Sequence, residues 1–117
     1  MGLVAAGSSL DLLAAMRYLS GMDPAALEAI VRRVAAQPHV RRIWLFGSRA
    51  RGEARERSDI DLAIEAPEAG RREWLDVCRL VEEEADTLLP IDLIRLEDVS
   101  EGLRARVRAE GQVLFER

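Results

Sequence analysis

The sequence predicts an α+β domain, a small mixed β-sheet of about three to four strands with helices packed on it. Segments that alternate apolar and polar residues are interleaved with segments that have the period of an amphipathic helix. The chain has 117 residues, the length of one domain, and 49% of them are hydrophobic, which is enough for a core. The connection between the first two predicted strands, residues 47–58, is long enough to permit a mixed sheet.

Two helices are predicted before the first strand. Residues 8–21 form a short amphipathic helix that begins after a serine and stops at a glycine. It belongs to a partly helical N-terminal extension, residues 1–22, which precedes the domain of residues 23–117. The second helix begins at Asp23-Pro24, a favoured cap followed by a favoured first residue, and ends at Gln37 because a proline follows.

Two strands follow, separated by a polar segment. Residues 41–46 (RRIWLF) read as a strand that Gly47-Ser48 breaks. Residues 49–58 are polar and predict a short helical turn and loop. Residues 59–65 (DIDLAIE) alternate strictly and predict the second strand.

The rest of the chain predicts two helices and further strands. Residues 100–111 form a charged helix that begins at a serine cap and stops at a glycine. Residues 91–96 are a third strand, and residues 113–116 are a short terminal strand or extension. Residues 71–88 form a long helix with one apolar stripe, made of Trp74, Cys78, Val81, Ala85 and Leu88.

Composition limits the classes of function. The net charge is −4, with 17 basic and 21 acidic residues, so direct nucleic-acid binding is not expected. No segment approaches the ~20 apolar residues of a membrane span, so no membrane association is expected either. The single cysteine excludes an intramolecular disulfide and favours a cytoplasmic protein, and one cysteine with one histidine cannot form a zinc cluster.

Carboxylates interrupt two of the apolar strands. Asp59 and Asp61 point to the same side of their strand, roughly 7 Å apart at Cα, and they repel each other unless a divalent cation lies between them. Hard oxygen ligands suit Mg²⁺. Asp92 repeats the pattern, and if its strand neighbours the second one, the three carboxylates suffice for two metal ions. Ordinary solvent-facing aspartates on half-exposed strands remain the alternative at this point.

The turn after the first strand adds a phosphate-binding feature. Gly47 lets the backbone approach an anion closely, and the N–H groups and hydroxyl at Ser48 predict a phosphate cradle. A cradle next to metal-binding carboxylates is the equipment for transfer from a nucleoside triphosphate. The residues follow a signature of the polymerase-β-like nucleotidyltransferase superfamily, namely Gly47-Ser48, Gly52 and Ser58-Asp59-Ile60-Asp61-Leu62.

The chain resembles the minimal members of that superfamily, the MNT proteins, over residues 24–116. The resemblance implies that Gly47 and Ser48 hold the triphosphate of ATP. It also implies that Asp59 and Asp61 bind Mg²⁺, two ions when the nucleotide is present, and that Asp92 is a third ligand that helps to deprotonate the attacking hydroxyl.

Two further residues are candidates for contact with the nucleotide. Arg49 follows Ser48 directly and is the best candidate among six arginines in residues 41–57 to neutralise phosphate charge. A solvated loop is the alternative for each of them. Ser58 precedes Asp59 and is expected to pin the loop by local hydrogen bonding.

The resemblance also implies a partner. Minimal members often pair with helical HEPN proteins as antitoxins, and some transfer AMP to a tyrosine of the toxin. The predicted function is therefore Mg²⁺-dependent transfer of NMP, expected to be AMP, to a hydroxyl of a HEPN-type partner. The alternatives are a catalytically idle antitoxin and an oligomeric enzyme that modifies a small molecule. Residues 10–19 and 113–115 are candidate partner contacts, or else they cover the chain's own core or form a homodimer.

Overall fold

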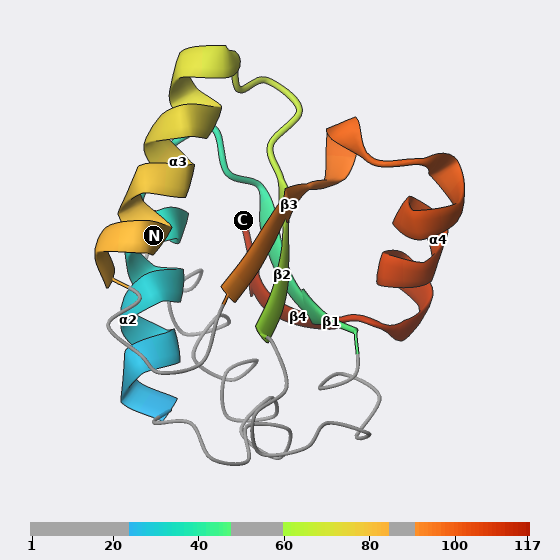
Figure 1. Ribbon diagram of the computed structural model, residues 1–117, viewed down its shortest axis with the longest axis horizontal. Coiled ribbons are helices and arrows are strands. Elements are labelled where there is room, and N and C mark those ends of the chain that lie inside the picture. The colour runs from blue at the N-terminus through green and yellow to red at the C-terminus, as the bar shows by residue number, and fades with distance from the viewer. Residues whose placement is uncertain (1–23, 48–59, 85–90) are drawn as a thin grey trace.

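The computed structural model describes residues 24–47, 60–84 and 91–117, which form a four-stranded sheet flanked by helices (Figure 1). The predicted helix at residues 8–21 and the extension to which it belongs lie outside these ranges. The elements follow in the order α2 (Pro24–Ala35), β1 (Arg42–Phe46), β2 (Ile60–Glu65), α3 (Arg71–Glu84), β3 (Ile91–Arg95), the 3₁₀ helix η2 (Leu96–Asp98), α4 (Glu101–Glu110) and β4 (Gln112–Glu116).

The sheet is mixed, as predicted, with the strand order β3-β2-β1-β4. Strand β1 lies in the middle and runs antiparallel to both β2 and β4, whereas β2 and β3 are parallel. A parallel pair needs a crossover connection, and α3 is the helix between these two strands. The last strand, which the sequence left open between strand and extension, is β4 and pairs with β1.

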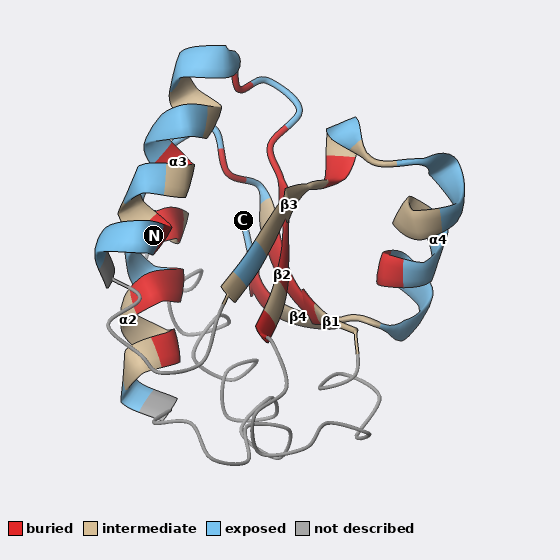
Figure 2. Cartoon of the chain, in the orientation of Figure 1, coloured by how far each residue is buried: buried red, intermediate tan, exposed pale blue. Residues whose placement is uncertain are grey.

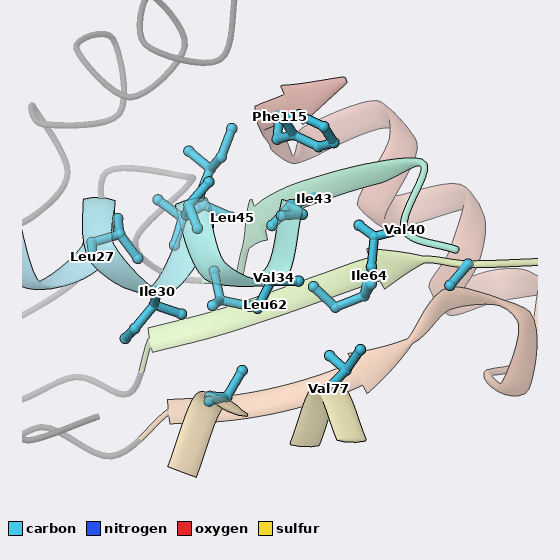
Figure 3. Packing of buried hydrophobic residues seen from close by; sticks show 14 of the residues in the cluster. Leu27, Ile30, Val34, Val40, Ile43, Leu45, Leu62, Ile64, Val77 and Phe115 are labelled. Atoms are coloured by element: carbon cyan, nitrogen blue, oxygen red, sulfur yellow. The ribbon is translucent and has the colours of Figure 1, made fainter. Parts of the chain in front are cut away.

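The helices cover the two faces of the sheet unequally. Helices α2 and α3 lie together on one face, where the main core forms, and α4 lies on the other (Figure 1). Figure 3 shows side chains of α2 and α3 converging on those of the sheet. The largest fully buried side chains of this main core are Leu27, Ile30, Ile43, Leu45, Ile60, Leu62, Ile64 and Leu114. The core under α4 is smaller and contains Trp44, Ala63, Leu96 and Val107.

The predicted ends of α4 are confirmed and the predicted C-terminal end of α2 is not, while the predicted end of α3 at Leu88 lies outside the described residues. The hydroxyl of Ser100 accepts a hydrogen bond from the Leu103 amide at 3.2 Å, and Gly111 follows the last residue of α4, so both predicted boundaries are confirmed. Helix α2 ends at Ala35 rather than at Gln37. The Gln37 amide bonds to the Val34 carbonyl, a tighter i to i−3 contact that closes the helix one turn before the proline.

Two predictions about apolar residues need correction. In α3, Val81 is buried and Trp74 packs against the core as predicted, but Val77 is buried where the prediction had Cys78, which is only half-buried. The other two predicted members, Ala85 and Leu88, lie outside the described residues. The positions three and four apart on a helix lie on neighbouring lines of its surface, and packing against the sheet decides between them. Residues 113–115 are not free for a partner, because Leu114 and Phe115 are buried in the chain's own core.

A β-bulge explains why both of these neighbours are buried. The pairing of β1 with β4 shifts between Ile43 and Trp44, so Leu114 is an extra residue opposite them. The alternation of β4 breaks at this point, and Leu114 and Phe115 both join the main core. None of the helices in residues 24–47, 60–84 and 91–117 has the length and apolar character that crossing a bilayer requires.

Candidate nucleotide and metal site

One end of the sheet brings the predicted residues of the described chain together. Strand β1 finishes there and runs into Gly47, while β2 and β3 both start there (Figure 1). Asp61 is the second residue of β2 and stands opposite Phe46 of β1 and in register with Asp92 of β3. Three neighbouring strands therefore place Gly47, Asp61 and Asp92 at the same end of the sheet.

Gly47 is glycine for two physical reasons. Its φ is +78°, in the left-handed region that side chains with a Cβ adopt only at a cost. A Cβ at this position would also collide with a carboxylate oxygen of Asp61 and would lie 3.1 Å from the Asp61 Cγ. The backbone of the turn thus packs directly against the Asp61 carboxylate, and the phosphate cradle predicted at Gly47 remains a prediction.

Asp61 and Asp92 lie side by side on the same face of the sheet. They are direct partners in the parallel register, and adjacent strands are about 4.8 Å apart. Asp61 is half-buried and Asp92 is exposed. Strand β3 as a whole is less buried than β2 (Figure 2). The condition set by the sequence, that the strand of Asp92 must neighbour the strand of Asp61, is met.

The remaining predicted site residues lie outside the described residues. These are Ser48, Arg49, Ser58 and Asp59, and their roles remain predictions. Within residues 24–47, 60–84 and 91–117 no group of three or more histidine, cysteine, aspartate or glutamate side chains is arranged to hold a metal ion. The described part therefore contributes two of the three predicted carboxylates, and Asp59 would have to complete the set.

The residues present are suited to Mg²⁺. Both carboxylates supply hard oxygen atoms, which this ion prefers, and Asp92 is open to water, which Mg²⁺ usually keeps in its coordination shell. Gly47 has no side chain, so this residue does not displace the Asp61 carboxylate. Asp61 and Asp92 are thus the described residues that could hold the ion.

An aromatic side chain borders the carboxylates. Phe46 is directly opposite Asp61, so its side chain lies on the same face, and it packs partly against the small core under α4. The half-buried ring is adjacent to the charged pair. Sequence reasoning did not select Phe46, because the register between two strands, the only signal for it, is not encoded in a local pattern.

The far end of the sheet uses its charges differently. Arg42, at the other end of β1 from Gly47, donates to Glu116 at 2.7 Å and to the buried Glu65 at 3.2 Å, which joins β2, β1 and β4. The hydrogen bond to Glu116, with the charge of Glu65, raises the pKa of Arg42 above its ordinary value. Of the arginines considered for phosphate binding, Arg42 is therefore engaged in the sheet.

Comparison with protein-family models identifies the domain. Residues 28–117 match the family described as "Polymerase beta, Nucleotidyltransferase". The chain belongs to this nucleotidyltransferase family. The match covers most of the chain, so the nucleotidyltransferase fold and enzyme class predicted from the sequence are confirmed. No curated protein sequence matches the chain.

Solved structures with the same fold include toxin–antitoxin complexes. One, a toxin–antitoxin with AMP-PNP, is 24% identical, with 82% of this chain and 75% of that chain covered and a TM-score of 0.61. A mutant MntA–HpeT toxin–antitoxin is 22% identical, with coverages of 77% and 72% and a TM-score of 0.59. A tri-AMPylated Shewanella oneidensis HEPN toxin in complex with MNT antitoxin is 22% identical, with coverages of 78% and 67% and a TM-score of 0.51. At these identities the likeness concerns the fold.

Proposed function

We propose that this nucleotidyltransferase transfers AMP from ATP, in the presence of Mg²⁺, to a hydroxyl group of a helical partner protein of the HEPN type, and that it acts as the antitoxin of that pair. The observation that carries the proposal is the contact between the left-handed turn at Gly47 and the Asp61 carboxylate, with Asp92 in register next to it. A glycine turn next to two neighbouring carboxylates supports metal-assisted nucleotidyl transfer, which needs backbone groups for the phosphates and carboxylates for the metal.

Each residue has a distinct role in this proposal. The backbone at Gly47, together with Ser48, would hold the triphosphate. Asp61 and Asp92, together with Asp59, would hold Mg²⁺, which supplies charge neutralisation at the phosphates and acidifies the attacking hydroxyl. The exposed Asp92 would receive the proton of that hydroxyl, because the acceptor can reach it from solvent. The acceptor oxygen then bonds to the α-phosphorus as the bond to the leaving pyrophosphate breaks.

The fold and the solved complexes support an acceptor hydroxyl that belongs to a second protein. A transferase must hold its acceptor within roughly 3–3.5 Å of the reacting phosphorus to gain from positioning. The described helices pack on the sheet through their apolar faces and offer no separate acceptor domain in residues 24–47, 60–84 and 91–117. Two of the complexes with this fold contain a toxin as the second protein, one of them AMPylated. The single cysteine agrees with action in the cytoplasm.

The proposal is tested by following label from ATP to protein. The chain is incubated with ATP labelled at the α-phosphate, with Mg²⁺, and with the helical protein encoded beside it, and modified protein is located by mass spectrometry. We expect one or more AMP additions on a hydroxyl side chain of the partner, and their loss in Asp61→Asn and Asp92→Asn. Asp76→Asn is the control, because Asp76 is an exposed carboxylate on α3, away from the site.

Two results would contradict parts of the proposal. A stable complex without any transfer of label would mean that the chain is an idle antitoxin. Label on a small molecule rather than on protein would mean that the acceptor class is wrong.

A further inference from the structure

We propose that Gly111 is a positioning residue for the site, because its close packing on β1 sets the position of the turn at Gly47. This inference rests on the proposed role of that turn in nucleotide binding. Gly111 is the single residue between α4 and β4, and its amide donates to the Val107 carbonyl at 2.7 Å. The chain therefore changes from helix to strand in one residue, directly beside β1.

The space around Gly111, and not its backbone conformation, requires a glycine. Its φ is −74° and its ψ is 156°, which any residue adopts. A Cβ at this position, however, would collide with the Val107 carbonyl oxygen, and it would lie 3.1 Å from Cδ1 of Trp44 and 3.3 Å from the Leu45 carbonyl oxygen. Two of these three obstacles are backbone atoms, which cannot rotate away as a side chain can.

The contact lies two residues before the site turn. Leu45 pairs with Leu62 of β2 on one side and with Gln112 of β4 on the other, so it is fixed in the middle of the sheet. Gly47 follows two residues later and has no room against Asp61. Gly111, packed against the backbone of β1, and Gly47, packed against the Asp61 side chain, thus lie close together along β1, and a shift at Gly111 has to be absorbed by β1 or by the turn. Packed interiors transmit such shifts because they contain little free volume.

The experiment measures the turn and the ligand separately. The amide signal of Gly47 is followed by NMR in the ¹⁵N-labelled protein, and the affinity for a non-hydrolysable ATP analogue with Mg²⁺ is measured well below the melting temperature. In Gly111→Ala we expect the Gly47 amide to move and the dissociation constant to rise roughly tenfold, since a misplacement of about an ångström far from the reacting atoms can already cost about 100-fold in rate.

Matched variants separate positioning from stability. Gly102→Ala adds the same methyl group to α4 where nothing lies within 4 Å, and it should leave both measurements unchanged. Val77→Ala removes buried side-chain atoms from α3 on the other face of the sheet, so it should lower the melting temperature without moving the Gly47 amide. If Val77→Ala moves that amide as far as Gly111→Ala does, the effect is general loosening and the proposal is wrong.

A second variant keeps the test decisive if Gly111→Ala does not fold. Val107→Ala loosens the seating of the same helical turn, since Val107 is buried against Trp44 in the small core. It should move the Gly47 amide in the same way but less. If Gly111→Ala folds, an unchanged Gly47 amide signal in it overturns the proposal. If it does not fold, an unchanged Gly47 amide signal in Val107→Ala overturns the proposal. Failure of the wild-type chain to bind the analogue would instead overturn the proposed function, and the amide would still decide the role of Gly111.

Discussion

Replacing Gly47 with alanine should destabilise the protein by an amount that can be worked out from the turn. An alanine at φ +78° carries the left-handed penalty of about 1–2 kcal/mol. Its Cβ would also push the Asp61 carboxylate out of its rotamer, which costs about 0.5–1.5 kcal/mol more. We therefore expect a loss of about 2–3 kcal/mol in the free energy of unfolding, measured by urea denaturation followed by circular dichroism.

Gly102→Ala provides the matched control for this prediction. Gly102 lies within helix α4 and has open space where its Cβ would be, so alanine there should stabilise the protein by about 0.5–1 kcal/mol. The two glycine-to-alanine changes should thus have opposite signs. If Gly47→Ala were as harmless as Gly102→Ala, the reasoning about the turn would be refuted.

A double-mutant cycle separates the two parts of the Gly47 effect. In an Asp61→Ala background the carboxylate is absent, so Gly47→Ala should cost only the left-handed penalty of about 1–2 kcal/mol. The coupling free energy between the two positions should then be roughly 0.5–1.5 kcal/mol. Additive effects would show that the carboxylate yields without cost, although the conformational part of the prediction would stand.

Three other features give predictions of their own. Arg42→Ala should lower the free energy of unfolding by about 1–3 kcal/mol, because it leaves the buried Glu65 without its cation. The pKa of Arg42 is raised, so its stabilising contribution is complete at every pH below the ordinary arginine pKa. The loss measured by urea unfolding should therefore be the same from pH 6 to pH 9. A loss that disappears within that range would contradict it. Burial, aided by Glu82, raises the pKa of the Cys78 thiol, so iodoacetamide should react with it more slowly in the folded than in the unfolded protein, and stability should fall as the pH rises through about 8.5 and above. Arg95→Lys should lower the melting temperature. Arg95 donates at 2.9 Å and 2.8 Å to two carbonyl oxygens of the segment between β2 and α3, and a single ammonium group cannot reproduce both contacts. An unchanged melting temperature would mean that these hydrogen bonds do not stabilise the fold.

Local signals in the sequence predicted the elements well, and long-range contacts were the part they could not predict. The caps at Ser100 and Gly111 bounded α4 because side-chain hydrogen bonding and the missing Cβ act within a few residues. The register that places Asp61 beside Asp92 was only a condition, since parallel pairing depends on a crossover that no local pattern describes. The second role of Gly111, its contact with β1, was missed for the same reason.

Strand β2 carries acidic side chains near both of its ends, and the two ends treat them differently. Glu65 is buried and receives a guanidinium group from Arg42, so the fold itself compensates its charge. Asp61 is only half-buried and stands beside the exposed Asp92, so one carboxylate neighbours another. Like charges destabilise a fold less where water screens them, which makes the exposed edge the place where such a pair can be kept without a bound ion.

That difference bears on what each carboxylate can do. An ion that approached Glu65 would have to displace Arg42 and enter the sheet, whereas an ion that approached Asp92 meets an exposed side chain at the edge strand β3. Asp61 is the register partner of Asp92 on the neighbouring strand β2, and Gly47, which has no side chain, packs against its carboxylate. The ion pair at the buried end of β2 and the two neighbouring carboxylates at its other end thus agree with where the sheet is covered and where it is open.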